Sequence, residues 1–338
     1  MATHQQRPHF DFDPPPQSDG PTHAHRSFRV MGSPANVTLT SVSAWAGVSA
    51  NVLLDLAEAR LRELEQHWSR FLPDSDITRA NLAAGSPVTV HSDTLDVVAR
   101  AVEAWKQTGG LFDVTVLPAL LHHGYRASRD SGSRDSAAEH RTITPAITAQ
   151  LIGVTGSIVI DRGRSTLTVP AGGAIDLGGI GKGFAADRVS VELIRAGASG
   201  VMIDIGGDLV VRGIPASGDR WLVGVEDPVD PPHLVSSLAL VIGGVATSGT
   251  TVQRWTSPTG QTVHHLIDPA TANPSTTSLL TATVLASDAA TAEVFATAAM
   301  MHDGPAAIEM LDSVGLAGLL VARDGATLRT RSLRSFAP

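Results

Sequence analysis

The chain has 338 residues, of which 43% are hydrophobic and 17% are charged; this is enough for a large core and excludes a wholly disordered chain. Its net charge of -8 argues against non-specific nucleic-acid binding, which needs Lys and Arg to neutralise phosphates. The absence of cysteine excludes disulfides, thiolate nucleophiles and cysteine-ligated metal centres.

The N-terminal residues 1–26 are rich in Pro, His, Asp and Gln and have little to bury, so we expect a flexible tail before a single domain at 27–338. The histidines of the tail lack the regular spacing of a metal site, and a solvated tail is the simpler interpretation. The sequence shows neither the apolar run of a signal peptide nor the roughly 18 apolar residues of a membrane helix. It therefore predicts no membrane insertion and a cytoplasmic location.

The predicted elements alternate irregularly along the chain. Apolar residues recur at helical spacing over 51–68 and 93–106, whereas the charged segment 126–141 has no apolar period and predicts a surface loop. Helical spacing returns over 184–195 and over 289–301, the latter after a strand-like TATVLA run. Short β-like runs lie at 157–161, 166–169, 201–205, 208–212, 221–225 and 238–242. This mixture predicts an α+β fold rather than a strictly alternating one.

The segment AIDLGGIGKGFAADRV, residues 174–189, leads from a strand-like approach through glycines into a predicted helix. Glycines let a ligand approach the backbone, and a helix start favours phosphate. The segment is not a P-loop, because Asp176 and Gly183 stand where that motif needs Gly and Ser or Thr. Phe184 likewise breaks the dinucleotide-binding fingerprint. Taken alone, the segment is most simply a tight connection without a ligand.

Other polar segments favour an anionic ligand. The sequence predicts a glycine turn at 204–208 and a polar turn at Thr247-Ser248-Gly249, and both offer hydroxyl and N–H donors. The segment HHLIDPATANP, residues 264–274, contains His265, a candidate proton acceptor near neutral pH. A histidine on a loop is more often an ordinary surface or hydrogen-bonded residue, so this signal is weak by itself.

Glu293 and Thr297 are four residues apart and therefore share one face of the predicted helix at 289–301. A carboxylate and a hydroxyl are hard oxygen ligands of the kind that Mg²⁺ prefers, together with substrate phosphate oxygens. The alternative is an exposed Glu beside a Thr bonded to its own helix, and the pair alone does not exclude it.

In their order along the chain, these segments resemble the motifs of the ApbE family of FAD:protein FMN transferases, over about residues 28–315. The resemblance rests on eight segments: VMGS at 30–33, HWSRFLPDSDITRAN, TGGLFDVTVLP, AIDLGGIGKGFAAD, DIGGD, ATSGT, HHLIDPATANP and the helix with Glu293. It implies an α+β fold of two packed lobes, with mixed or antiparallel sheet and flanking helices, and FAD in the cleft between the lobes.

The resemblance also implies roles for single residues. The FAD contacts would be Met31, Phe71, Leu111, Phe112, Asp113, Asp176, Lys182, Thr247, Ser248, Gly249, Leu266 and Ile267. Mg²⁺ would be held by Glu293, Thr297 and the carbonyl of Gly179, while His265 and Lys182 would be catalytic. The chain departs from the family pattern at Glu293, where Asp is usual, at Ala272, where Gly is usual, and at Val114, where Pro is frequent.

The implied reaction is Mg²⁺-dependent transfer of FMN from FAD to a Thr or Ser hydroxyl of an acceptor protein with an FMN-binding domain, with AMP as the leaving product. The same residues are consistent with an FAD pyrophosphatase, in which water replaces the acceptor hydroxyl, and with a flavin-binding carrier or sensor without turnover. A purely structural module is the alternative that leaves the ordered polar segments unexplained.

Overall fold

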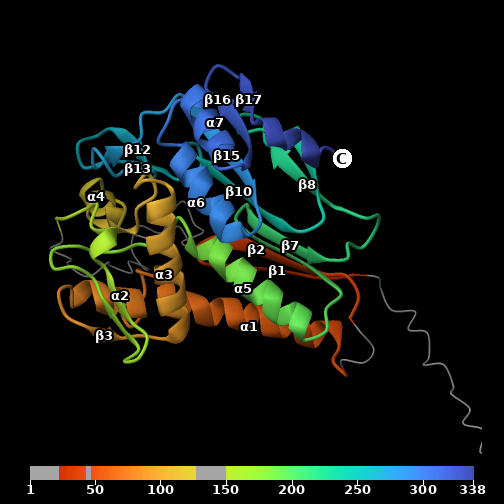
Figure 1. Ribbon diagram of the computed structural model, residues 1–338, viewed down its shortest axis with the longest axis horizontal. Helices are drawn as coiled ribbons and strands as arrows, with labels where there is room; N and C mark the ends of the chain where they lie inside the picture. The colour runs from red at the N-terminus through yellow and green to blue at the C-terminus, as the bar shows by residue number, and fades with distance from the viewer. Residues whose placement is uncertain (1–22, 43–46, 127–149) are drawn as a thin grey trace, which may run out of the picture.

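The computed structural model describes residues 23–42, 47–126 and 150–338 (Figure 1). Within these ranges, eight strands form one antiparallel sheet in the order β1-β2-β6-β7-β10-β15-β16-β17. The strands are β1 Ala24–Val30, β2 Ser33–Leu39, β6 Gly200–Ile205, β7 Asp208–Gly213, β10 Gly243–Gly249, β15 Leu279–Ala286, β16 Ala317–Ala322 and β17 Thr327–Arg329. The predicted α+β fold with an antiparallel sheet is confirmed.

Four smaller sheets accompany the large one in the described part of the chain. They consist of β3 Val88–Thr89, β5 Thr166–Thr168 and β4 Val159–Asp161; of β8 Trp221–Glu226 and β9 Leu234–Leu240; of β11 Arg254–Thr256 and β12 Thr262–His264; and of β13 Ile267–Asp268 and β14 Asn273–Pro274. His265 lies in the short connection between β12 and β13, directly before the last of these hairpins.

The described part of the chain forms helices, four of which cover one face of the large sheet. They are α1 Ala50–Trp68, α2 Asp76–Leu82, α3 Ser92–Gln107, α4 Leu117–His122, α5 Gly181–Arg195, α6 Ala289–Ala299 and α7 Gly304–Ser313, with 3₁₀ turns η2 Val114–Val116, η3 Thr155–Ser157 and η4 Arg331–Phe336. Across the sheet, α1 packs on β1 and β2, α5 on β6 and β7, α6 on β10 and β15, and α7 on β16 and β17 (Figure 1). The other face is covered by the β8–β9 hairpin and by η4.

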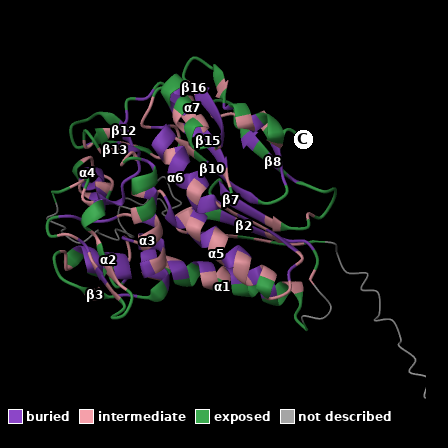
Figure 2. Ribbon diagram, in the orientation of Figure 1, coloured by how far each residue is buried: buried purple, intermediate pink, exposed green. Residues whose placement is uncertain are grey.

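Burial alternates along the central strands because successive side chains point to opposite faces. In β7, Val210 belongs to the core under the helices, while Leu209 and Val211 pack with β8 and β9. In β15, Val284 and Leu285 divide in the same way. The sheet is therefore buried on both faces, as the purple strands in the centre of Figure 2 show.

The long helices form where the apolar spacing predicts them. In α1, the residues Leu53, Leu54, Ala57, Leu61, Leu64 and Trp68 are buried on one face, and the Ser49 hydroxyl accepts a hydrogen bond from Val52 N at the N-terminus. The predicted helices at 93–106, 184–195 and 289–301 correspond to α3, α5 and α6. The described residues contain no helix that is both long and apolar enough to cross a bilayer.

Three details of the sequence interpretation are wrong. Residues 24–26 belong to β1 and not to a tail, because they pair with β2. The Thr247-Ser248-Gly249 segment is the end of strand β10, paired with β15, and not a turn. The segment before the glycines, 174–177, is not a strand. Residues 1–22 of the predicted tail and 127–141 of the predicted loop lie outside the described residues.

Candidate functional site

The glycine segment makes a tight turn that ends in the first turn of α5. Gly178 N donates a hydrogen bond to Asp176 Oδ1 (2.6 Å), and Gly181 N donates to Leu177 O (2.7 Å), which brings the chain into the helix. A Cβ atom at Gly183 would lie 2.5 Å from the carbonyl oxygen of Ala289, so only glycine allows α6 to approach α5 this closely.

Three charged side chains from three elements meet at this turn. Lys182 of α5 forms ion pairs with Asp208, the first residue of β7, and with Glu293 Oε1 of α6, whose oxygen lies 3.2 Å from Nζ. The side chains of Asp208 and Glu293 are each only 3% exposed. Lys182, Asp208 and Glu293, here named the Lys182 cluster, thus bring together segments that are far apart in the sequence.

The carboxylate of Glu293 is buried, and this burial raises its pKa above the usual range. The positive charge of Lys182 and the N–H of Gly183 act in the opposite direction. Gly183 N donates to Glu293 Oε2 (2.8 Å), whereas Oε1 accepts no hydrogen bond of good geometry. Glu293 therefore retains an oxygen that can ligate a cation.

One turn further along α6, Thr297 continues the same face of the helix. Its hydroxyl lies 3.1 Å from Ser248 Oγ of β10. A Cβ atom at Gly179 would lie 3.6 Å from Thr297 Oγ1 and 3.1 Å from Phe112, so the backbone of the glycine turn passes close to both side chains. The predicted residues Gly179, Lys182, Ser248, Glu293 and Thr297 thus lie together.

His265 precedes β13 and is influenced electrostatically by Lys182 and Asp176, which places it near the same turn. Burial, followed by the charges of His264 and Lys182, lowers its pKa to about 4. Its ring is therefore neutral at pH 7 and can accept a proton. Its Nδ1 atom is buried and has no hydrogen-bond partner among the described residues, whereas His264 Nε2 is bonded to Ser275 O (3.0 Å).

The residues that follow His265 anchor it between two apolar clusters. Leu266 packs into the core between the large sheet and the helices that cover it. Ile267 packs with Leu117 and Ala174 beside α4. Both side chains are about 4% exposed, so the backbone on the C-terminal side of His265 is firmly held.

Sequence reasoning missed Arg70, which is 4% exposed and forms an ion pair with Asp176. Its guanidinium also donates to Tyr125 O (3.1 Å) and lies over the rings of Phe71 (4.0 Å) and Tyr125 (4.9 Å). Arg70 thereby joins two predicted FAD residues, Asp176 and Phe71. The sequence signal that could have identified Arg70 is its position directly before Phe71, within the segment HWSRFLPDSDITRAN of the family resemblance.

The remaining predicted FAD residues make contacts outside the Lys182 cluster. Met31 N, in the β1–β2 turn, donates a hydrogen bond to Glu65 Oε1 of α1 (2.7 Å). Leu111 N donates to Thr108 O (3.3 Å) in the turn after α3. Asp113 Oδ1 accepts from Thr115 N (2.6 Å) and so begins η2. Thr247 Oγ1 lies 2.9 Å from Thr283 Oγ1 across the strand pair. The FAD-binding roles of these residues and of Gly249 remain predictions.

A second group with metal-ligand chemistry lies elsewhere, where Glu63 and His67 of α1 meet His91. The two imidazole rings are stacked at 4.5 Å with an angle of 13° between their planes. Nitrogen lone pairs lie in the ring plane, so two parallel stacked rings do not aim at a common ion. We therefore do not assign a metal to this group.

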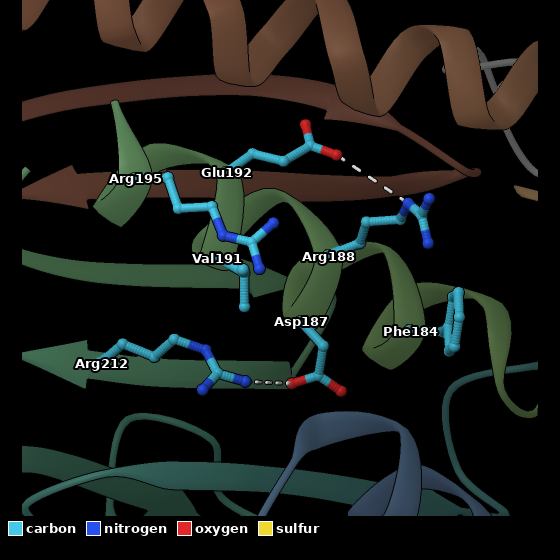
Figure 3. A pocket seen from close by; sticks show the side chains of 7 residues that line it. All are labelled: Phe184, Asp187, Arg188, Val191, Glu192, Arg195 and Arg212. Atoms are coloured by element: carbon cyan, nitrogen blue, oxygen red, sulfur yellow. Dashed lines mark ion pairs between the residues drawn. The ribbon is translucent and has the colours of Figure 1, made fainter. Parts of the chain in front are cut away.

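A hollow of about 340 Å³ lies on the outer face of α5 (Figure 3). Its lining consists of Phe184, Asp187, Arg188, Val191, Glu192, Arg195 and Arg212. It contains none of the residues predicted to bind FAD or metal, so it is distinct from the site around Lys182.

Known proteins named FAD:protein FMN transferase are similar to this chain over most of its length. A FAD:protein FMN transferase of Salmonella typhimurium (strain LT2) is 27% identical over 319 residues, which cover 91% of this chain and 88% of that protein. A protein of the same name from Klebsiella pneumoniae (strain 342) is 27% identical over 286 residues, covering 83% of this chain and 80% of that protein.

Solved structures share the fold. An ApbE protein from Thermotoga maritima superposes with a TM-score of 0.78 at 23% identity, over 94% of this chain and 99% of the other. The apo form of the flavinyl transferase ApbE of Pseudomonas stutzeri has a TM-score of 0.75 at 24% identity, over 93% and 96% of the two chains. The family model described as ApbE family matches residues 31–320. The chain therefore belongs to the ApbE family.

Proposed function

We propose that this protein is a Mg²⁺-dependent FAD:protein FMN transferase that moves FMN from FAD to a Thr or Ser hydroxyl of an acceptor protein and releases AMP. The observation that carries the proposal is the meeting of Gly179, Lys182, Glu293 and Thr297 at the start of α5, with His265 nearby. Membership of the ApbE family and the names of the relatives support it.

The donor set at this turn fits a magnesium ion. Glu293 Oε1 is a buried carboxylate oxygen without a well-formed hydrogen bond, and Thr297 adds a hydroxyl one turn away. Glu293, Thr297 and the carbonyl of Gly179 would hold Mg²⁺, which would neutralise charge on the pyrophosphate of FAD. Lys182 can retain Asp208 as its partner when Glu293 turns to a metal.

The residues of the chain supply the remaining chemistry. Because burial keeps the imidazole of His265 neutral at pH 7, this ring can take the proton from the acceptor hydroxyl as the hydroxyl oxygen bonds to the FMN phosphorus. The bond from that phosphorus to the bridging oxygen breaks, and AMP leaves with the electron pair. The positive charge of Lys182, which is paired with the proposed metal ligand Glu293, would stabilise the phosphate oxygens during this exchange.

The variant His265→Ala tests the proposal, because it removes the base without touching the Lys182 cluster. We expect it to bind FAD but to lose transfer by about 10²- to 10⁴-fold, the usual contribution of a positioned base. The measurement is in-gel flavin fluorescence of a candidate acceptor incubated with enzyme, FAD and Mg²⁺, with free FMN and AMP quantified in parallel to detect hydrolysis.

The control is His233→Ala, a change of the same type at a side chain that is 75% exposed. It should leave both FAD binding and transfer unchanged. Full transfer by the His265 variant would refute its role as base. Release of free FMN without labelled acceptor would instead identify the protein as an FAD pyrophosphatase.

A further inference from the structure

Each of the helices α5 and α6 has a carboxylate that accepts hydrogen bonds from the N-terminus of the other helix. These two connections are here named the Asp187 link and the Glu293–Gly183 link. Asp187 of α5 accepts hydrogen bonds from Ala289 N (3.0 Å) and Ala290 N (2.9 Å), the first two residues of α6. In the reverse direction, Glu293 of α6 accepts a hydrogen bond from Gly183 N of α5 (2.8 Å). The first N–H groups of a helix have no partner within the helix, and here each helix supplies a partner to the other.

The local caps show why both links are needed. The residue before α5 is Ile180, whose side chain makes no cap hydrogen bond, so Glu293 provides a side-chain acceptor for this helix start. Helix α6 has its own cap, Asp288, but that side chain accepts from Thr291 N. The N–H groups of Ala289 and Ala290 are bonded to Asp187 instead.

The backbones at this junction also leave no space for adjustment. A Cβ atom at Gly183 would lie 2.5 Å from Ala289 O, and a Cβ atom at Gly244 of β10 would lie 2.3 Å from Ala289 Cα. The start of α6 is thus wedged between α5 and β10, two elements that carry Lys182 and Ser248.

Asp187 lies on the wall of the hollow on α5, outside the site around Lys182. Figure 3 shows its carboxylate between Arg212 and the ribbon of α6, with Arg212 3.7 Å from Oδ1. Its side chain is 15% exposed, and its hydrogen bonds and ion pair go to Ala289 N, Ala290 N and Arg212 and not to the proposed ligands Glu293 and Thr297. Any effect of Asp187 on those ligands must therefore pass through the position of α6.

We infer that Asp187 is a positioning residue that fixes the start of α6, so that Glu293 and Thr297 reach the start of α5. The two links join the same pair of rigid helices, so loss of the Asp187 link loosens the Glu293–Gly183 link although neither of its residues is changed. The role toward a metal rests on the proposed function, whereas the coupling between the two links does not.

The test compares Asp187→Ala with Asp288→Ala, which removes the cap of the same helix without cutting the connection to α5. The first readout is hydrogen–deuterium exchange of the Gly183 amide. Loss of one hydrogen bond corresponds to about tenfold faster exchange, and we expect this at Gly183 in the Asp187 variant only. The Asp288 variant should speed exchange at Thr291.

The second readout is Mn²⁺ binding, followed by electron paramagnetic resonance, because Mn²⁺ takes the same oxygen ligands as Mg²⁺. We expect Asp187→Ala to weaken it about tenfold, the loss typical of residues that orient metal ligands. Asp288→Ala should leave it unchanged. The conservative variant Asp187→Asn retains one acceptor and should restore part of both signals; it also replaces the alanine variant if that one does not fold.

Unchanged exchange at Gly183 in the Asp187 variants would overturn the inference, as would equal effects of Asp187→Ala and Asp288→Ala, because a simple loss of helix capping would then explain both. If the unaltered protein binds no Mn²⁺ and transfers no FMN, the proposed function fails, and the exchange rate at Gly183 still decides whether the two links are coupled.

Discussion

Ala272 shows how a single residue sets the shape of the loop after His265. Its φ angle is 59°, in the left-handed region that favours glycine, and its N–H donates to Asp268 O (2.9 Å) to close the turn. The family pattern has glycine at this position, so the departure identified from the sequence carries a conformational cost here. An alanine in this region is disfavoured by about 1–2 kcal/mol.

Replacing Ala272 by glycine should therefore stabilise the protein. We expect Ala272→Gly to raise the free energy of unfolding by about 0.5–1 kcal/mol, since the relief of strain exceeds the greater chain entropy of glycine. Ala270→Gly, in the same turn but without a positive φ, should lower it by a similar amount. Urea unfolding of both variants checks the opposite signs, and a loss of stability in Ala272→Gly would contradict the strain.

At the scale of elements, the pairing of α5 with α6 matters most for the site. The two helices contact each other at their starts through Asp187, Gly183 and Glu293. Periodicity predicted both helices but not this contact, because spacing within one helix says nothing about which helix lies next to it. The carboxylate of Asp187 is desolvated by its burial, and this raises its pKa from 3.8 to about 6.

The raised pKa of Asp187 predicts that the contribution of the α5–α6 contact to protein stability depends on pH. Between pH 4 and 6, the unfolded chain ionises Asp187 while the folded chain keeps the proton, so the contribution of Asp187 to stability is largest below pH 4 and is lost as the pH rises through about 6. The stability of the unaltered protein relative to Asp187→Asn should fall by at most about 3 kcal/mol over this range.

Urea unfolding of both proteins at several pH values between 4 and 7 measures this difference. Asparagine does not titrate, so the variant supplies the baseline for all other groups. A difference that stays constant or grows with pH would show that the hydrogen bonds from Ala289 and Ala290 outweigh the burial of the carboxylate.

At the scale of the whole molecule, the antiparallel sheet is the platform that brings the site together. Its strands β7 and β10 supply Asp208 and Ser248, and the helices on one face supply Lys182, Glu293 and Thr297. A ligand that contacts all of these residues binds only when the sheet and its helices are folded together, because the residues separate when the chain unfolds. Ligand binding should therefore stabilise the whole fold and not only the loop at 264–268.

FAD and Mg²⁺ together should raise the melting temperature. At a ligand concentration of about 100 times Kd the gain is roughly 2.7 kcal/mol, or about 4 °C for a chain of 338 residues, because the entropy of unfolding is roughly 2.1 cal/mol/K per residue. We expect the variant Glu293→Gln to lose the part of this gain in melting temperature that depends on Mg²⁺. The control variant Glu309→Gln, at an exposed position on α7, should keep that part. Thermal scans with FAD, with Mg²⁺ and with both make the comparison; an equal Mg²⁺-dependent gain in both variants would remove Glu293 from the metal site.

Much of the fold could be predicted where local spacing carries the signal. The apolar period predicted α1, α3, α5 and α6, and alternation with turn residues predicted β6, β7 and β8. Strands β1, β2, β10, β16 and β17 were not predicted. In β16, for example, all residues from Ala317 to Val321 are buried because both faces of the sheet are covered, so the strand shows no alternation to detect.

The sequence alone determined the family resemblance, the glycine turn before α5 and the common helix face of Glu293 and Thr297, because each of these depends on residues close together in the chain. Only the tertiary structure decided that Lys182 meets Asp208 and Glu293, and that Arg70 pairs with Asp176. Those partners are tens to hundreds of residues apart, and no local period encodes their distance. They meet because the helices pack across the buried sheet in one arrangement, and that packing depends on the whole chain.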